Sequence, residues 1–534
     1  MPSGGKFVNG TGSIATNGNK MDIAGNNKNN VIAWGGGFNI GKEASVNFTT
    51  NQKNYLNLDY TNKASQILGK LNGGTNNIYL VNPSGVLIGK DASINANKFG
   101  VSTSPFDNNA IQTFSNNGSF SPVFSANKGD IVNMGTISAN EIVLVGNRVT
   151  NVGNYVDEKG KKQVAFGSFN KKDSLTNTKL EITANHTDLH ANGNTIGTID
   201  SITVTAKGNN AKIEVGQSAT GWTDVQLGIN QNGNVTITTY TSIKDTEDWS
   251  SFADIINGGN TNNIDTFKLI KDIDFKDAGA IEPVGNDNSK PFSGNFYGNG
   301  HTLSNLLIDA DGKNSAGLFG YINGGSVQDL TIDGLNFQGS ASVIGGFAGR
   351  IDNGTFSNIV LNNIGDISGS SSAGGFAGLG AGTFSNIVLN NIGNISDKVA
   401  GGFVGRIRYG TFSNIVLNNI GDISGFNGAG GFAGHIGAGT FSNIALNNIG
   451  EINSELNSAG GFASLINNGG TFSNIVFNNI GNISGDHAGG FAGDGSPTSA
   501  TDIYFYGAMN LIGGNTNQDN INSHNQTALN LAKT

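Results

Sequence analysis

Short runs of apolar residues, separated by Gly, Asn and Ser, recur along the whole chain. In the first half they include residues 78–81, 86–88, 141–145 and 202–205, with Asn-Gly or Gly-Asn turns between them at a spacing of about ten residues. Almost none of these runs carries a 3.6-residue apolar period over a helical length. The pattern predicts short β-strands joined by tight turns.

The second half repeats itself. The tripeptide Gly-Gly-Phe recurs in steps of 27 to 30 residues and ends at Phe347, Phe376, Phe403, Phe432, Phe462 and Phe491, with a weaker first copy ending at Phe319. Between these copies runs the block Thr-Phe-Ser-Asn-Ile, which starts at Thr355, Thr383, Thr411, Thr440 and Thr471. Each unit therefore reads as two or three short strands separated by turns.

A unit of this size cannot bury its own apolar face, but stacked units can bury one another's. Three strands of about five to seven residues plus turns make one coil of a parallel β-helix, and each coil lies about 4.8 Å above the last. The fold class expected is all-β: a right-handed parallel β-helix, with an N-terminal capped domain that continues into, or is joined to, a repeat β-helix.

Constant register predicts two ladders in the repeats. One is an internal stack of phenylalanines, Phe356, Phe384, Phe412, Phe441 and Phe472. The other is a column of asparagines at one turn, whose amides bond coil to coil: Asn358, Asn386, Asn414, Asn443 and Asn474. A ligand-binding stripe is the alternative interpretation. Core and turn ladders are favoured, because a constant period is what stacking needs.

Four segments are expected: a β-helix domain at 1–235, a capping and transition segment at 236–315, repeats of about 29 residues at 316–495, and a polar tail at 496–534. Within the transition segment, residues 249–257 predict a two-turn helix that Asp248 or Ser250 caps and Gly258 ends. Such a helix would seal the open end of the second solenoid. Residues 99–128, rich in Asn, Ser and Phe, are interpreted as an extra-helical hairpin or loop.

Composition narrows the function classes. The chain has 82 Gly, 7 Pro and no Cys, and its formal net charge is −9. The lack of Cys removes disulfides, thiolate nucleophiles and Cys-ligated metals. The net negative charge has the wrong sign for binding a nucleic acid or anionic lipid. The chain contains no stretch of about twenty apolar residues, so no membrane span is predicted. The start, Met1-Pro2-Ser3, has no basic or apolar leader, so we expect the signal peptide to be absent or removed.

Candidate chemistry is thin. Asp272, Asp274 and Asp277, with Lys271 and Lys276, form the richest charge cluster, and we interpret it as a solvated strand edge in preference to a metal or acid-base site. His186 and His190 have the spacing of a metal pair only on a helix, and a strand would place them about 13 Å apart. Arg350, Arg406 and Arg408 are expected on turns. We therefore expect no catalytic residue, metal or cofactor, and no enzymatic activity.

Several blocks in the first 150 residues resemble the secretion domain of two-partner secretion exoproteins, the filamentous haemagglutinin-like adhesins. The central one is Asn82-Pro83-Ser84-Gly85, similar to that family's Asn-Pro-Asn-Gly segment. Further matches lie at residues 2–5, 38–42, 64–69 and 143–151. Ser84 stands where the family usually has Asn, and a second such motif is absent, which places the chain nearer the high-molecular-weight adhesin branch.

The resemblance implies a right-handed β-helix that the periplasmic domains of a dedicated outer-membrane transporter of the Omp85 type recognise. The chain would then cross unfolded and fold outside, so the start at Pro2-Ser3 would follow signal cleavage, and the lack of Cys would suit the passage. Asn82, Pro83, Ser84 and Gly85 would form a β-turn. That turn either only shapes a corner or also contacts the transporter, and both readings stay open.

The repeats resemble the GLUG type found in bacterial surface proteins, over about residues 245 to 495, and residues 292–303 and 317–320 match its lead-in. Together the resemblances imply a secreted adhesin, extracellular or at the surface of a Gram-negative bacterium, that binds host or neighbouring cells through its shaft by an unknown receptor or glycan. The alternatives are a carbohydrate-active β-helix enzyme and the stalk of a contact-dependent toxin.

Overall fold

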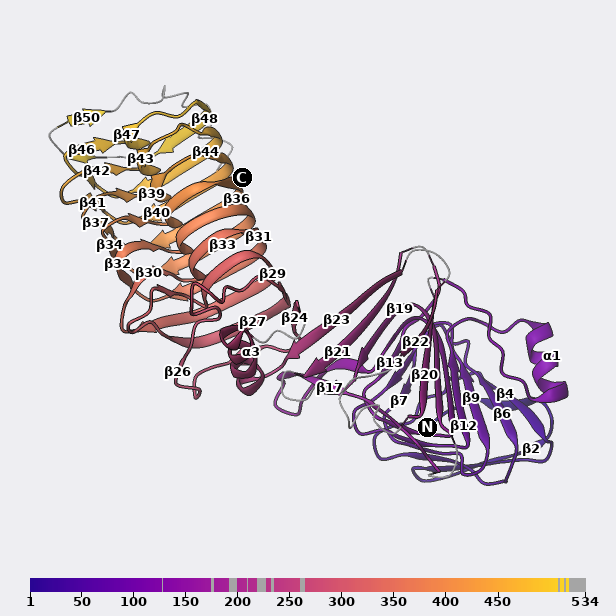
Figure 1. Ribbon diagram of the computed structural model, residues 1–534. Helices are drawn as coiled ribbons and strands as arrows, with labels where there is room; N and C mark the ends of the chain where they lie inside the picture. Colours follow the sequence, from indigo (N-terminus) through magenta and orange to yellow (C-terminus); the bar gives the residue numbers. More distant parts are fainter. Residues whose placement is uncertain are drawn as a thin grey trace. The chain divides into compact units, whose positions relative to one another are not determined.

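The computed structural model describes residues 1–126, 128–173, 177–191, 199–208, 210–218, 227–231, 235–259, 265–507, 510–512 and 515–517 of the 534-residue chain. These residues form a parallel β-solenoid divided into two compact units, Met1–Thr241 and Ser242–Thr534. In each unit, strands far apart in the sequence lie side by side and pair in register (Figure 1). The predicted parallel β-solenoid is confirmed.

The first unit begins with an antiparallel cap. Strand β1 (Gly5–Asn9) pairs antiparallel with β4 (Asn29–Trp34), and β2 (Gly12–Asn17) pairs antiparallel with β3 (Lys20–Gly25). Every later inter-coil ladder with a described register is parallel, so the cap covers the strand edge that the first coil would otherwise expose.

Parallel ladders then build three faces. The first runs through β4, β6 (Asn54–Leu58), β9 (Asn77–Val81), β12 (Lys98–Ser102), β15 (Glu141–Thr150), β19 (Lys179–His190), β20 (Ser201–Ala206) and β22 (Leu227–Gln231). The second runs through β7 (Ser65–Ile67), β10 (Val86–Ile88), β13 (Ile131–Asn133), the later halves of β15 and β19, β21 (Ala211–Ser218) and β23 (Val235–Ile243). The third runs through β3, β5 (Ser45–Phe48), β8 (Lys70–Asn72), β11 (Ser93–Asn95), β14 (Thr136–Ser138) and β18 (Ser168–Asn170).

Two excursions leave the first solenoid. One contains helix α1 (Asn108–Asn117), which Asp107 caps and Gly118 ends, so the interpretation of residues 99–128 as a hairpin or loop is wrong. Its Phe114 ring is buried and meets the Tyr79 ring edge-on at 5.7 Å. The other is the antiparallel hairpin of β16 (Val152–Val156) and β17 (Lys162–Phe166), which the sequence pattern did not predict.

Helix α3 (Thr246–Gly258) opens the second unit. Its cap is Asp245, whose side chain accepts a bond from the Asp248 backbone N–H at 2.9 Å, and Gly259 ends it at φ 74°. The helix is thus a turn longer than predicted at its start. Neither Asp248 nor Ser250 is its N-cap, and its C-cap is Gly259 instead of Gly258. Trp249 and Phe252 are buried and pack on the aromatic rings of the first coil, which closes the apolar core at this end.

The coils of the second unit combine long bent strands with short ones. The long strands pair in the order β24 (Thr266–Leu269), β27 (Asn295–Asp309), β29 (Phe319–Gln338), β31 (Ala348–Ile364), β33 (Ala377–Ile392), β36 (Val404–Ile420), β40 (Thr440–Ile449), β44 (Thr471–Ile480) and β48 (Ser499–Tyr506). Strands β25 (Ile273–Asp274) and β26 (Ala280–Ile281) also pair with β27, and β39 (Ala433–Ile436), β43 (Ala463–Ile466) and β47 (Ala492–Gly495) continue the first part of β36.

The short strands close each coil. They are β28 (Ser315–Ala316), β30 (Ala341–Gly345), β32 (Ile367–Gly374), β34 (Ile395–Asp397), β35 (Ala400–Gly401), β37 (Ile423–Gly425), β38 (Ala429–Gly430), β41 (Ile452–Ser454), β42 (Ser458–Gly460), β45 (Ile483–Ser484), β46 (His487–Gly489), β49 (Leu511–Ile512) and β50 (Asn515–Asn517). Because β48, β49 and β50 continue the ladders, the described part of the predicted polar tail is one more coil; residues 518–534 lie outside the described residues.

The core of the second unit holds two columns of phenylalanine rings. Phe356, Phe384, Phe412, Phe441 and Phe472 are fully buried and stack at centroid distances of 4.7 to 5.0 Å. The Gly-Gly-Phe rings form a second stack, which meets the first edge-on, as Phe432 meets Phe412 at 90°. Offset stacks and edge contacts are the favoured aromatic geometries, so the two columns support each other.

Asparagine ladders bind the coils at their corners. The Nδ2 atoms of Asn386, Asn414, Asn443 and Asn474 each donate to the Oδ1 of the predicted residue one coil earlier, at 2.8 to 3.0 Å. These residues have φ of 52° to 55°, the left-handed region that Asn tolerates. Two parallel ladders that the sequence pattern did not predict follow: Asn362, Asn390, Asn418 and Asn447, and Asn363, Asn391, Asn419, Asn448 and Asn479.

Candidate functional site

The turn that follows β9 is the first candidate site. Asn82 accepts a bond from the backbone N–H of Gly85 (3.1 Å) on its carbonyl and one from the N–H of Ser84 (2.9 Å) on its side chain. Gly85 has φ 118°, and a Cβ there would lie 3.0 Å from the carbonyl oxygen of Asp130 on the next coil. Gly at this place is thus required by both conformation and space.

Asn82 also anchors a buried polar chain that crosses coils. Its Nδ2 donates to Lys63 O and to Ser65 Oγ, both at 2.8 Å. The Ser65 hydroxyl in turn donates to Asp59 Oδ2 at 2.7 Å, and the same carboxylate oxygen accepts from the Phe38 N–H at 2.8 Å. Every member of this chain has a partner, which is what makes a buried polar network stabilising.

Exposure separates the roles within the tetrapeptide. Asn82 has no exposed surface, and Gly85 is buried. Pro83 is half-buried and its carbonyl accepts from the Gly129 N–H at 2.8 Å, while Ser84 is exposed. A partner that meets this corner on the folded unit can therefore reach Ser84 and part of Pro83, whereas Asn82 acts on the corner from inside.

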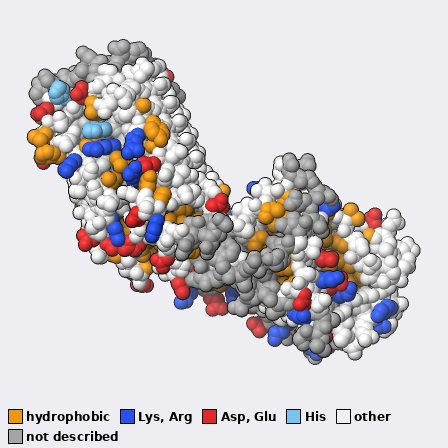
Figure 2. All heavy atoms as spheres, in the orientation of Figure 1, with side chains coloured by type: hydrophobic (Ala, Val, Ile, Leu, Met, Phe, Trp, Pro, Cys, Tyr) orange, Lys and Arg blue, Asp and Glu red, His pale blue; other side chains and the backbone are white. Residues whose placement is uncertain are grey.

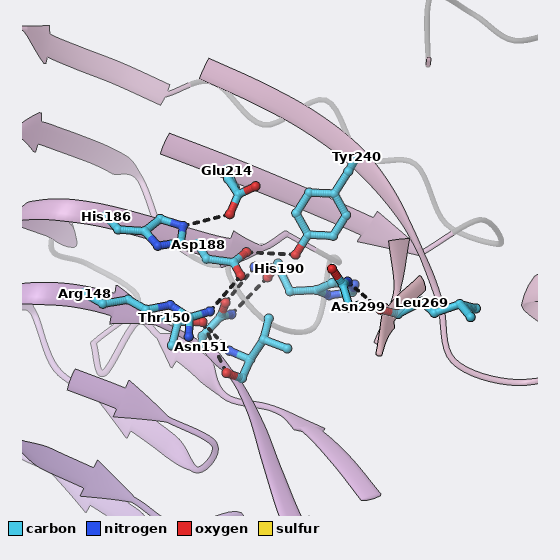
Figure 3. A network of polar contacts seen from close by, with 11 residues as sticks. Arg148, Thr150, Asn151, His186, Asp188, His190, Glu214, Tyr240, Leu269 and Asn299 are labelled. Atoms are coloured by element: carbon cyan, nitrogen blue, oxygen red, sulfur yellow. Dashed lines mark hydrogen bonds and ion pairs between the residues drawn. The ribbon is translucent and has the colours of Figure 1, made fainter. Parts of the chain in front are cut away.

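A network of polar side chains lies near the end of the first unit (Figure 3). Asp188 accepts from Tyr240 OH at 2.8 Å and pairs with Arg148 at 3.3 Å, and His186 bonds Glu214 at 2.7 Å. Burial is the main cause that raises the pKa of Tyr240 well above its ordinary value of 10. Because the phenol is buried and bonded to Asp188, the network ties β23 to β19 instead of opening a cleft.

The histidine pair and the acidic cluster have structural partners. His186 pairs with Glu214, and the His190 ring stacks on Phe166 at 3.9 Å. Asp272 accepts from the Thr302 N–H at 3.0 Å and Asp274 from Asn305 at 2.8 Å, so both carboxylates serve coil-to-coil contacts. Among the residues that the structure describes, no group of three or more His, Asp or Glu side chains is arranged to hold a metal ion.

The arginines of the repeats lie on strands β31 and β36, so their predicted place on turns is wrong. Arg350 forms a two-pronged ion pair with Asp352, with bonds of 2.9 and 2.5 Å, and its guanidinium lies 4.8 Å from the centre of the Tyr321 ring. Arg408 reaches the same carboxylate at 3.4 Å. Burial acts to raise the pKa of Asp352, but the bonds from Arg350 and Tyr321 outweigh it and hold that pKa below its usual value. Figure 2 shows coloured side chains gathered on this part of the second unit, beside a largely white surface.

Comparisons with known proteins give partial likenesses. No family model matches the chain. It is 29% identical over 248 residues to a heme/hemopexin-binding protein of Haemophilus influenzae, which covers 44% of this chain and 27% of that protein. It is 36% identical over 88 residues to halomucin of Haloquadratum walsbyi, which covers 15% of this chain and 1% of that protein. The chain thus spans about a quarter or less of the curated relatives it matches.

Among solved structures, the chain aligns with the secretion domain of HMW1 from Haemophilus influenzae at 16% identity and a TM-score of 0.25, covering 78% of this chain and 97% of that one. No helix of the described residues is long and apolar enough to cross a membrane.

Proposed function

We propose that the chain is a secreted bacterial exoprotein, exported by a dedicated outer-membrane transporter, that acts at the cell surface as a non-catalytic, adhesin-like shaft. The observation that carries the proposal is the capped solenoid of the first unit. Its secretion-like sequence blocks occupy the cap and successive coils around the buried Asn82 turn. The repeats, similar to the GLUG type, would form the exposed shaft.

Two observations support this role. The similarity to the Haemophilus influenzae protein over 248 residues favours binding over catalysis, since that relative is named for what it binds. The chain has no Cys, so no disulfide can form before it threads a pore unfolded. Stacking of coils, which needs no covalent link, can then drive folding outside.

The export test uses cells that produce the chain behind a cleavable signal peptide, with and without a candidate Omp85-type transporter. Full-length protein should accumulate in the medium only when the transporter is present. Release that does not depend on the transporter would count against the proposal.

Two variants separate folding from recognition. Asn82→Asp places a carboxylate against Lys63 O and loses both donated bonds, so we expect reduced export together with a loss of about 3 kcal/mol in the stability of the purified protein. Ser84→Lys changes the exposed side chain and should leave stability unchanged. If the transporter contacts this corner of the folded turn, Ser84→Lys lowers export; if its export equals that of the parent, the turn acts only through folding.

A further inference from the structure

The repeats of the second unit act as internal copies that can be compared with one another. On two columns of the surface the copies agree. The column just before the corner at Asn358 carries Ser357, Ser385, Ser413, Ser442 and Ser473. The column on the strand just after this corner carries Val360, Val388, Val416, Ala445 and Val476. One column does not agree. Its paired positions are Tyr321, Arg350, Leu379, Arg406, His435, Leu465 and Asp494.

Loops beside this column differ as well. Asp397, at the end of β34, and the loop residues Phe426 and Leu456 stack through backbone bonds. The Phe426 N–H donates to Asp397 O at 3.0 Å, and the Leu456 N–H donates to Phe426 O at 3.1 Å. A Cβ on Gly428 would lie 3.0 Å from His435 Nε2, so this loop packs directly against the column. We call the column, these neighbours and the adjoining residues Lys398, Arg408 and Tyr409 the varied face. In solenoids, differences between copies collect on one face, which is often the binding face.

Charge gathers on the varied face. Every Lys and Arg between residues 316 and 495 is found there: Arg350, Lys398, Arg406 and Arg408. The whole chain has four Arg, so three of them lie within about three coils. Figure 2 shows Lys, Arg and His colours together with exposed hydrophobic side chains on this part of the second unit. Arg350 and Arg408 already pair with Asp352, so Lys398 and Arg406 are the cations of this group that an anion could meet.

The arginines are not equivalent. The Arg350 guanidinium is committed to Asp352 by two bonds. Arg406 forms no ion pair with a carboxylate of the described residues, and its Nε is buried without a hydrogen-bond partner there. Nearby, Oδ2 of Asp397 is also buried and has no partner within the described part of the chain. Both atoms are enclosed by protein, whereas each residue keeps part of its surface exposed, so a ligand would meet the outer parts of these two residues.

Aromatic surface adjoins these groups. Tyr409 is 54% exposed, pairs with Ala381 of β33, and donates its hydroxyl to Asp352 O at 3.2 Å, two coils away. The hydroxyl thus reaches past the coil of β33, which carries the small residues Gly380, Ala381 and Gly382 at this place. Phe426 and Leu456 are also about half exposed. Flat aromatic rings beside hydrogen-bonding groups offer one stacking surface and several polar contacts.

We propose that the varied face, centred on Arg406, Tyr409, Phe426 and His435, binds an oligosaccharide that carries a carboxylate. Arg406 pairs with the carboxylate, for which the guanidinium fork is matched. Tyr409 and Phe426 pack on sugar rings, whose C–H faces are apolar. Asp397 accepts hydrogen bonds from hydroxyl groups of the sugar, and His435 donates to them.

The size of the face favours a glycan over a protein. The part of the varied face around Arg406, Phe426 and Leu456 spans three coils, or about 15 Å. A patch of similar width covers about 200 Å², far below the about 800 Å² per partner that a stable protein interface buries. An acidic peptide would use Arg406 but gains little from the two exposed rings. The biological use of the face rests on the proposed function at the cell surface. Glycan binding is measured on purified protein, so the binding proposal and the proposed function can fail separately.

The test is binding of the purified full chain to an array of uronate and sialylated oligosaccharides, each printed beside its carboxyl-reduced counterpart, with tetraglutamate as the peptide probe. We expect at least one acidic glycan to bind at least tenfold more tightly than its reduced form. Arg406→Gln and Phe426→Ser should each weaken that binding at least tenfold.

Thr411→Ala, on the uniform surface, is the matched control and should change nothing. Circular dichroism and unfolding midpoints check that the variants fold, since both replaced side chains are partly exposed. The proposal is overturned if no acidic glycan binds above its reduced form, if Arg406→Gln leaves binding unchanged, or if tetraglutamate binds as well as the best glycan.

Discussion

Replacing Phe412 by Ala tests whether the stacked rings hold the second solenoid together. Phe412 is fully buried, stacks on Phe384 at 4.7 Å and on Phe441 at 5.0 Å, and meets Phe432 edge-on at 6.1 Å. A buried Phe→Ala change costs about 3–5 kcal/mol. We expect a value near the upper end, because both stacked neighbours lose a face and strands about 4.8 Å apart cannot close the cavity.

The control is Phe505→Ala in β48. That ring is half-buried and stacks on one described ring, Phe477, at 4.5 Å, so its loss should cost about half as much. Unfolding of the purified full chain in guanidinium, followed by circular dichroism, measures both. Because coils interact with their nearest neighbours, Phe412→Ala should also broaden the transition or split it. If Phe412→Ala lowers the free energy of unfolding no more than Phe505→Ala does, ring stacking contributes little, and the backbone hydrogen bonds between coils provide most of the stability.

Three further changes probe other parts of the fold. Asn418→Ala removes a bond to Asn390 and one from Asn447, so it should lower the free energy of unfolding by about 2 kcal/mol. An equal loss in Thr411→Ala, which is in no asparagine ladder, would contradict this. Gly85→Ala should cost at least about 2 kcal/mol, because φ is 118° and the Asp130 carbonyl is 3.0 Å from the new methyl group; unchanged urea unfolding would refute the strain. Burial raises the pKa of Asp397 to about 6 against the opposing effects of Lys398 and Arg406, so the folded state loses stability as pH rises from the ordinary value of 3.8 through about 6. The melting temperature of Asp397→Asn should therefore exceed that of the parent at pH 7.5 and equal it at pH 3.5. A difference that does not change with pH would contradict the raised pKa of Asp397.

Periodicity made the core of the second unit readable from sequence. A residue that recurs once per coil must occupy the same place in every coil, so the repeat alone was enough to place Phe412 and Asn414. The asparagine ladders of Asn362 and Asn363 were harder to predict. In a regular strand, Asn362 and Asn363 would point to opposite faces, but Asn363 has φ 56° and turns the corner, so both side chains face outward and form ladders.

Features that occur once could not be predicted in the same way. Helix α1 contains weak helix formers, and Phe114 is its one buried residue, so tertiary packing on Tyr79 stabilises it more than its own propensity. The buried hydrogen-bond network of Asn82 could be predicted only if the registers of β7 and β9 were known. The contact of Arg408 with Asp352 joins residues 56 positions apart, across the intervening coil of β33, so no local pattern could indicate it.

The asparagine ladders have a direction, and it gives the array a defined first and last copy. Each amide donates toward the N-terminal side, and the ladders of Asn358 and Asn363 begin on the carboxylates of Asp329 and Asp333, which can only accept. At the other end, Asp502 follows Asn474 in register and Gly507 lies against Asn479, and neither side chain can donate to continue the chain of bonds. Between these ends any coil can be followed by another of the same kind. A duplicated or deleted coil would change the length of the shaft by about 4.8 Å and leave the start, the stop and the pattern of asparagine bonds unaltered.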